Sequence, residues 1–299
     1  MLYHTPVLLH TCINALNIHP DGVYVDVTYG GGGHSAEILK LLKKGRLVVF
    51  DQDADAFKNK VENDKLLFIR NNFSNLKEAL NENGIIEVNG ILADLGVSSH
   101  QFNEASRGFS IRFDANLDMR MDTGSSLTAS CILNKYEEKQ LVNIFSNYGE
   151  VENSKRLAFT IVTNRKAKTI ETVSDLKLVI NRCIPPKKEN QYLAQVFQAL
   201  RIEVNNELES LKKMLIQSED VLVKGGRLVV ISYHSLEDRL VKNFMKKGKF
   251  EGELDKDIYG NVNAPFELIN KKPIVPDEQE IVENNRARSA KLRIAQKTV

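Results

Sequence analysis

The sequence predicts an α/β fold, in which a Rossmann-like sheet has helices on both faces, together with an inserted helical domain. Four consecutive glycines at 30–33 separate an apolar run at 23–27 from a segment with helical apolar spacing. Further short apolar runs follow, as expected of buried parallel strands. The interval 97–225, between two such runs, is much longer than a strand-helix-strand connection needs and carries three-to-four-residue apolar spacing. Together these three observations predict the fold class.

The glycine turn predicts a site for an adenosine-bearing cofactor. Glycine has no side chain to keep a ligand away from the backbone, and it tolerates the positive φ angles of a sharp turn. Gly31, Gly33 and Ala36 satisfy the dinucleotide fingerprint G-x-G-x-x-A, so the turn by itself does not separate NAD from another such cofactor. The alternative is a merely flexible turn, which the order of strand, turn, helix, strand and acid disfavours.

The next predicted strand ends at an acidic residue. The apolar run 46–50 indicates a buried strand, and Asp51 follows it directly. In a doubly wound sheet, an acid at the end of the second strand, about 20 residues beyond the glycines, binds ribose hydroxyls. Asp51 is therefore a candidate ribose ligand.

The interval after a strand expected at 90–96 predicts an insert made of helices. The run 226–233 resumes the sheet, and Gly225 with Gly226 is expected to end the helix before it. The predicted domains are a discontinuous sheet domain, 1–110 and 208–299, and an inserted substrate-recognition domain, 111–207. Helices are expected at 137–148, 152–164, 173–183 and 191–223.

Composition indicates a globular intracellular enzyme without naming one. The chain has 299 residues, 42% of them hydrophobic, which is enough for a large core. No apolar run approaches the roughly 20 residues that span a bilayer, and the first residues do not resemble a signal peptide. The cysteines are three in number and form no CxxC pair, so neither a disulfide framework nor a zinc site is indicated. We expect a cytoplasmic protein without a metal.

Positive charge is concentrated in two stretches although the formal net charge is only +2. Between Lys155 and Lys188 there are nine Lys or Arg residues against Glu171 and Asp175, and the tail from Arg286 carries no acid. Such clusters suit binding to a phosphate backbone. The alternative for either stretch is a solvated helix face or a solvated tail.

Two segments follow predicted strands, where chemistry is expected. Asp94 could accept a hydrogen bond from a substrate amine, or it could orient its own loop. Ser235 and Asp238 fit a capping box that opens a helix, which leaves Tyr233 and His234 facing the site. A Ser-His-Asp hydrolase has little support because no G-x-S-x-G elbow is present.

Ordered motifs along nearly the whole chain resemble the bacterial S-adenosylmethionine-dependent 16S rRNA (cytosine-N4) methyltransferases, the RsmH or MraW family. The glycine turn with His34 and Ser35 is one of them. The others are the segments 4–9, 94–99, 107–110, 117–122, 148–150, 197–208, 231–239 and 286–293. The segments His100–Asn103 and Asn190–Gln195 depart from the family pattern, which leaves the exact RNA contacts open.

The resemblance implies a class I methyltransferase fold with S-adenosylmethionine as cofactor and a cytosine of the decoding region of 16S rRNA, in the small ribosomal subunit, as substrate. Phe73, after a strand at 66–69, would form an aromatic wall for adenine, with a core phenylalanine as the alternative. Phe109, Phe113 and Tyr233 are the nearby aromatic side chains on which a base could stack. The expected cofactor-binding residues are Gly32, Gly33, His34, Asp51, Phe73, Asp94 and Gln101. The candidate catalytic acceptors are Asp94, Ser98 and His234, and the candidate RNA-binding residues are Lys155, Arg156, Arg165, Lys166, Lys168, Arg286, Arg288 and Lys291.

Two other functions remain open from the sequence. The glycine fingerprint also fits an NAD-dependent oxidoreductase, although no catalytic pair for that chemistry is evident. A non-catalytic RNA-binding or ribosome-assembly factor could share the fold, but it would be expected to have lost Asp51 or the glycines, which this chain keeps.

Overall fold

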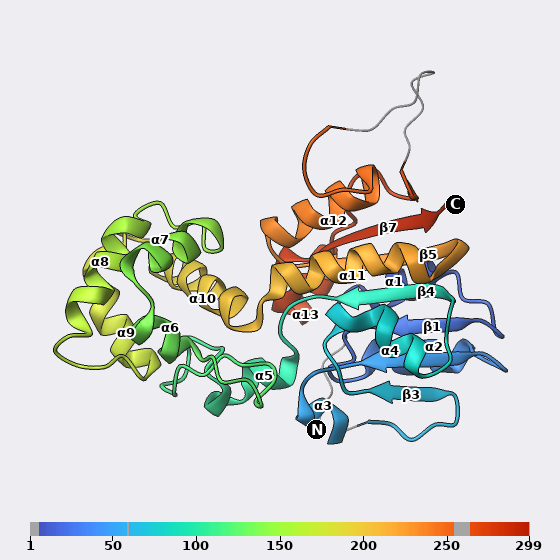
Figure 1. Ribbon diagram of the computed structural model, residues 1–299, viewed down its shortest axis with the longest axis horizontal. Coiled ribbons are helices and arrows are strands. Elements are labelled where there is room, and N and C mark those ends of the chain that lie inside the picture. Colours follow the sequence, from blue (N-terminus) through green and yellow to red (C-terminus); the bar gives the residue numbers. More distant parts are fainter. Residues whose placement is uncertain (1–5, 59, 254–263, 299) are drawn as a thin grey trace. The chain divides into compact units, whose positions relative to one another are not determined.

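The computed structural model describes residues 6–58, 60–253 and 264–298. The chain divides into two compact units. One consists of Met1–Gly96 and Leu208–Val299 and contains the sheet, and the other, Val97–Glu207, consists of helices and loops (Figure 1). Among the described residues, no helix is long and apolar enough to cross a membrane.

The sheet has seven strands in the order β3-β2-β1-β4-β5-β7-β6. The first five strands along the chain run parallel, whereas β7 pairs antiparallel with both β5 and β6. This arrangement confirms the predicted Rossmann-like sheet. The strands are β1 Val23–Asp26, β2 Arg46–Phe50, β3 Leu66–Ile69, β4 Val88–Asp94, β5 Leu222–Ser232, β6 Phe266–Leu268 and β7 Lys291–Lys297.

Alternate side chains of the central strands pack against helices on opposite faces of the sheet, as predicted. Val48 and Ile91 lie in one apolar cluster with helices α4, α11 and α12, while Val49 and Leu92 lie in another with α1 and α2. Successive strand residues point to opposite faces, so a run that is apolar at every position must be covered on both sides. The helices of this unit are α1 Leu9–Leu16, α2 Gly33–Leu41, α3 Ala54–Lys58, α4 Leu76–Glu82, α11 Glu207–Val221, α12 Ser235–Lys247 and α13 Glu278–Glu283.

The expected helix end at Gly225 and Gly226 is wrong. Helix α11 ends at Val221, and both glycines lie inside β5. The register between β4 and β5 shifts there, because Val88 pairs with Leu222 whereas Gly90 pairs with Arg227. Gly225, with φ +83°, accommodates this irregularity of the strand.

The second unit is helical and has its own apolar core, which includes Phe145, Leu157, Ile161 and Leu200. The segment 191–223, expected as one helix, is two helices separated by Asn206. Asn206 has φ +49°, a left-handed conformation that asparagine tolerates better than most residues. The helices of this unit are α5 Ser99–Asn103, α6 Ala129–Lys135, α7 Glu138–Asn147, α8 Ser154–Asn164, α9 Val173–Ile180 and α10 Glu189–Asn205.

The helical unit begins at Val97, whereas the insert was expected to begin at residue 111. The earlier segment belongs to the helical unit because Phe109 is buried in that unit's core. Arg107 adds polar contacts, since its guanidinium donates to the backbone carbonyls of Arg120 and Met121 at 2.8 and 3.1 Å.

Candidate active site

Acidic side chains meet at the carboxyl edge of the parallel strands. Asp26 is the last residue of β1, Asp94 is the last residue of β4, and Asp51 directly follows β2. Ligands of doubly wound sheets bind outside this edge. The sheet therefore brings residues that are far apart in the sequence to the position where the cofactor is expected.

The glycine turn joins this edge to α2. Gly32 precedes the helix with φ +74°, and a Cβ atom added to it would lie 2.7 Å from the hydroxyl oxygen of Tyr29. A Cβ atom on Gly33 would lie 2.2 Å from Cγ of Pro6. A side chain at either position would therefore have to displace Tyr29 or Pro6, and the positive φ of Gly32 also favours glycine.

His34, in the first turn of α2, is buried and points toward Asp94. Its Nε2 lies 3.1 Å from the carbonyl oxygen of Val7, and because a carbonyl only accepts, Nε2 carries the proton. Its Nδ1 lies 3.8 Å from Oδ2 of Asp94. The His34 imidazole is therefore held by the carbonyl of Val7, just before α1, and its other nitrogen faces the Asp94 carboxylate.

The Asp94 carboxylate is also held by Tyr233, which directly follows β5. The Tyr233 hydroxyl donates to its Oδ1 at 2.6 Å, and the Asp94 backbone N–H donates to Oγ1 of Thr28 at 2.7 Å. Burial raises the pKa of Asp94 above its usual value, while the positive character of His34 and the Tyr233 hydrogen bond oppose that rise. The carboxylate is thus an oriented hydrogen-bond acceptor with increased basicity.

Asp51 is positioned by two backbone groups. Its Oδ2 accepts from the N–H of Gly30 and its Oδ1 from the N–H of Asp53, both at 2.8 Å. Each carboxylate oxygen still has a lone pair available for a further donor, such as a ribose hydroxyl. Burial nevertheless raises the pKa of Asp51 to about 6, against the lowering effect of these two hydrogen bonds.

Asp26 was missed in the sequence. Only 1% of it is exposed, and it accepts from the Ser35 hydroxyl at 2.6 Å and from the Thr28 N–H at 3.1 Å. It thereby links β1 to the start of α2, and its negative charge contributes to the raised pKa values of both Asp51 and Asp94. An acid that ends an otherwise apolar strand was the signal that could have identified it.

Phe73 opens a 3₁₀ turn, Phe73–Asn75, shortly after β3. Its ring is half-buried and packs against the apolar cluster on one face of the sheet. Part of the ring therefore packs in the core, as expected of a core phenylalanine, and part remains exposed, as an adenine-binding wall would require.

Comparison with known proteins identifies the family. The sequence model of the MraW methylase family matches residues 1–298. The chain belongs to this family. It is 54% identical to "Ribosomal RNA small subunit methyltransferase H" of Christiangramia forsetii, over 99% of this chain and 98% of that protein. A protein of the same name from Cytophaga hutchinsonii is 55% identical over 99% of this chain and all of its own length.

The MraW methylase membership confirms the resemblance found in the sequence motifs. The doubly wound sheet with its reversed β7 is the class I S-adenosylmethionine-dependent methyltransferase fold that was expected. S-adenosylmethionine is the cofactor that this family and fold indicate. The family also disfavours the NAD-dependent oxidoreductase alternative.

His234 is the residue that caps α12, so the expected capping box of Ser235 and Asp238 is wrong. Nδ1 of His234 accepts from the Glu237 N–H at 3.4 Å, and Oε2 of Glu237 accepts from the Tyr233 N–H at 2.8 Å. Asp238 instead binds Arg293 on β7, with Nε and Oδ1 2.6 Å apart. Histidine is not a preferred cap, so the sequence favoured the serine one residue later.

Ser98 and Gln101 also have a structural role, within the helical unit. Oγ of Ser98 accepts from the Gln101 N–H at 3.2 Å, and the Gln101 side chain accepts from the Ser98 N–H at 3.0 Å. This is a capping box for α5, and it was present in the sequence as S-x-x-Q. The side-chain oxygen of each residue thus already accepts a hydrogen bond from a backbone N–H at the start of α5.

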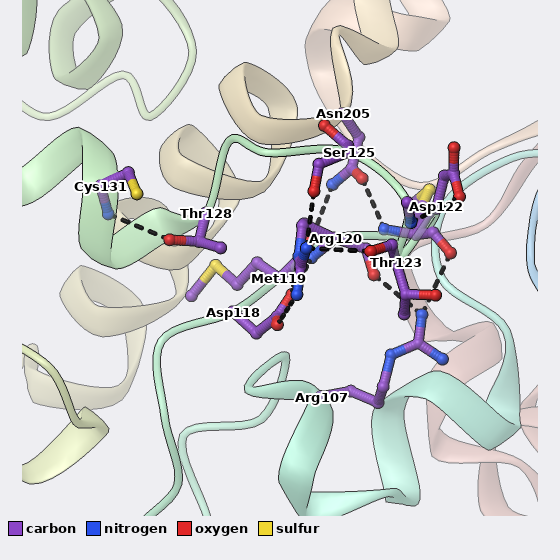
Figure 2. A network of polar contacts seen from close by, with 12 residues as sticks. Arg107, Asp118, Met119, Arg120, Asp122, Thr123, Ser125, Thr128, Cys131 and Asn205 are labelled. Atoms are coloured by element: carbon purple, nitrogen blue, oxygen red, sulfur yellow. Dashed lines mark hydrogen bonds and ion pairs between the residues drawn. The ribbon is translucent and has the colours of Figure 1, made fainter.

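The motif 117–122 forms a polar network in the helical unit rather than a basic surface (Figure 2). Arg120 binds both carboxylate oxygens of Asp118, at 2.8 and 2.7 Å, and donates to the carbonyls of Thr123 and Ser125. The Asn205 side chain accepts from the Met121 N–H and donates to the Met119 carbonyl, both at 2.7 Å. Met119 has φ +60°, so these contacts hold a strained backbone in place.

The candidate RNA-binding residues of the insert differ in their surroundings. Lys155 and Lys166 are exposed. Arg156 donates to the carbonyl of Arg182 at 2.7 Å and Arg165 to that of Leu133 at 2.7 Å, whereas Lys168 pairs with Asp175 at 2.6 Å. Lys168 is thus partly neutralised, and Arg165 is anchored to α6.

The basic tail is part of the sheet unit rather than a solvated extension. Arg286 and Arg288 lie in a 3₁₀ turn, Asn285–Ser289, and Lys291 begins β7. Nζ of Lys291 lies 3.8 Å from Oδ2 of Asp238. Arg288 is exposed, whereas Arg286 and Lys291 are half-buried.

Proposed function

We propose that this protein transfers a methyl group from S-adenosylmethionine to N4 of a specific cytosine in the decoding region of 16S rRNA in the small ribosomal subunit. The names of its relatives support an rRNA substrate, and such a substrate implies a cytoplasmic site of action. The observation on which the chemistry rests is the Asp94 carboxylate, held by Tyr233 and facing His34 beside the glycine turn.

Asp94 fits the needs of methyl transfer to an amine. The exocyclic amine of cytosine is a poor nucleophile because its lone pair is delocalised into the ring. An acceptor that orients the amine in line with the sulfonium methyl group supplies most of the acceleration. S-adenosylmethionine would supply the electrophilic methyl group, and the electron pair of its carbon–sulfur bond would stay on sulfur as N4 took the methyl group. N4 then loses a proton, which Asp94 accepts readily because its pKa is raised.

The cofactor is proposed to lie along the carboxyl edge of the sheet. Gly32, Gly33 and His34 would line its methionine end, and the two remaining lone pairs of Asp51 would accept from the ribose hydroxyls. The exposed part of Phe73 would contact the adenine ring. Asp94 and Gln101 complete the proposed set.

Ser98 and His234 remain secondary candidates as amine acceptors. Each already accepts a backbone N–H as a helix cap, which leaves less acceptor capacity for a substrate. Asp94 is therefore the first choice among the three.

The helical unit is proposed to recognise the RNA. Phosphates would bind its basic side chains and those of the tail, because neutralising each phosphate releases counterions. The proposed residues are Lys155, Arg156, Arg165, Lys166, Lys168, Arg286, Arg288 and Lys291.

Two measurements test this function. Calorimetry should show binding of S-adenosylmethionine, and binding of NADH alone would favour the oxidoreductase instead. Incubation with labelled cofactor and small subunits from a strain that lacks this enzyme should place the label on N4 of one cytosine. Cofactor binding without any transfer would favour the assembly-factor alternative. Parallel reactions with free 16S rRNA and with assembled subunits would distinguish the two forms of the substrate.

A further inference from the structure

An exposed aromatic ring stands on α8 of the helical unit. Leu157, Ala158 and Ile161 of this helix are buried in the unit's core, whereas 60% of Phe159 is exposed. By contrast, Phe109 is 7% exposed, so it is unavailable for stacking without rearrangement. Phe159 was not among the aromatic residues singled out in the sequence, because the helical spacing there draws attention to the buried face.

Basic side chains flank this ring. Lys155 and Arg156 precede Phe159 by four and three residues, so they lie on the same side of the helix, and Lys166 lies just beyond the helix end. Arg156 donates to the carbonyl of Arg182, which brings a further exposed cation next to α8. The nearest acid along the chain is Glu152, which precedes the helix.

An open aromatic face with cations on either side matches the chemistry of an unpaired nucleotide. Every base has a π face that can stack on an aromatic ring, and its flanking phosphates bind lysine and arginine. The core of a protein interface, in contrast, is depleted in lysine. The surroundings of Phe159 therefore favour a single-stranded nucleic acid over a protein partner.

We propose that Phe159 is a stacking platform for an unpaired nucleotide of the rRNA, with Lys155, Arg156 and Lys166 binding its phosphates. The inference rests on the proposed function and specifies how the insert would hold its substrate. It requires no contact between the two units of the chain.

The test is binding of the full chain to a fluorescein-labelled single-stranded RNA dodecamer, followed by fluorescence anisotropy at several salt concentrations and without cofactor. F159A should weaken binding about 5- to 100-fold, and F159W should retain it. F159L should bind nearly as weakly as F159A, because leucine keeps apolar area but has no ring. Replacing Lys155 and Lys166 by alanine should reduce the slope of log K against log salt by about 0.7 for each cation.

The matched control is I86A, which removes a 77% exposed apolar side chain from the sheet unit and should leave RNA binding unchanged. Thermal unfolding of every variant reports whether it folds. We expect F159A and I86A to fold, because both side chains are exposed. Equal affinity of F159A and the unmodified chain would overturn the proposal, as would absence of RNA binding by the unmodified chain. Unchanged RNA binding with weakened binding to whole subunits would assign the face to a ribosomal protein instead.

Failure of the proposed function would look different. In that case, labelled methyl groups would not reach the rRNA, while the Phe159-dependent affinity for RNA could persist. Equal RNA affinity of F159A and the unmodified chain, with methyl transfer intact, would instead overturn only the role of Phe159.

Discussion

Replacing Tyr233 by phenylalanine removes the hydroxyl group that donates to Asp94 at 2.6 Å while it keeps the aromatic ring. A hydrogen bond to a charged group contributes about 1.5 to 3 kcal/mol. Since one pKa unit corresponds to about 1.4 kcal/mol, its loss should raise the pKa of Asp94 by about one to two units. The Asp94 side chain is 24% exposed, so water can replace part of the bond, and we expect a rise of about one unit.

The direction of the pH effect follows from the ionised form of Asp94. The carboxylate accepts the amine proton, so activity is present above the pKa of Asp94 and is lost as the pH falls through it. Burial already raises this pKa, and the Tyr233 hydrogen bond limits the rise. In Y233F the acid limb of the rate profile should therefore move to higher pH by about one unit, with a much smaller change on the alkaline plateau.

The assay is the initial rate of methyl transfer from labelled S-adenosylmethionine to small subunits, measured from acidic to mildly alkaline pH. Y192F is the matched control, because the Tyr192 hydroxyl donates to Asn153 in the helical unit at 2.8 Å and should not affect Asp94. An acid limb that stays in place in Y233F, with rates otherwise intact, would refute the role of Asp94 as acceptor or its control by Tyr233.

Three further predictions concern the cofactor site and the insert. The unmodified protein should lose affinity for S-adenosylmethionine below about pH 6, because the Asp51 carboxylate, with its pKa of about 6, becomes protonated there. D51N should abolish this pH dependence, which calorimetry across this pH range tests. A pH dependence that persists in D51N would argue against Asp51 as ribose ligand. G33A should weaken cofactor binding by about 10-fold or more, since its new Cβ would lie 2.2 Å from Pro6 and the turn must shift at a cost of about 1 to 3 kcal/mol; affinity equal to that of the unmodified chain would show that the turn adapts freely. N205A should destabilise the helical unit by about 2 to 3 kcal/mol, because three hydrogen bonds to backbone groups are lost, and thermal unfolding should show this while cofactor affinity stays the same.

Local patterns in the sequence predicted much of the fold. Runs that are apolar at every position predicted buried strands, and β2 and β3 have the expected bounds. The end of α11 was predicted wrongly, because glycines before a strand resemble a helix stop whereas here they accommodate a shift in strand register. The break at Asn206 was also missed, since apolar spacing continues across it and one left-handed residue leaves no mark on that spacing.

The candidate site was predicted unevenly. Asp51 and Asp94 were identified because each follows or ends a recognisable strand. Asp26 was overlooked because it appears in the sequence as an interruption of an apolar run, and its contacts with Ser35 and Thr28 depend on the folded turn. His234 was recognised as notable, but its role as a helix cap depends on backbone geometry that the residue preferences do not favour.

The sequence by itself determined the family, the strand-turn-helix unit with its obligatory glycines, and the presence of a helical insert, because these depend on residue types at short spacing. Only the tertiary structure decided which side chains meet. The bond from Tyr233 to Asp94 joins residues 139 positions apart. Strand order brings them together, and strand order follows from the packing of whole elements rather than from any local pattern. For the same reason, burial alone separates Phe109, in the core of the insert, from the exposed ring of Phe159.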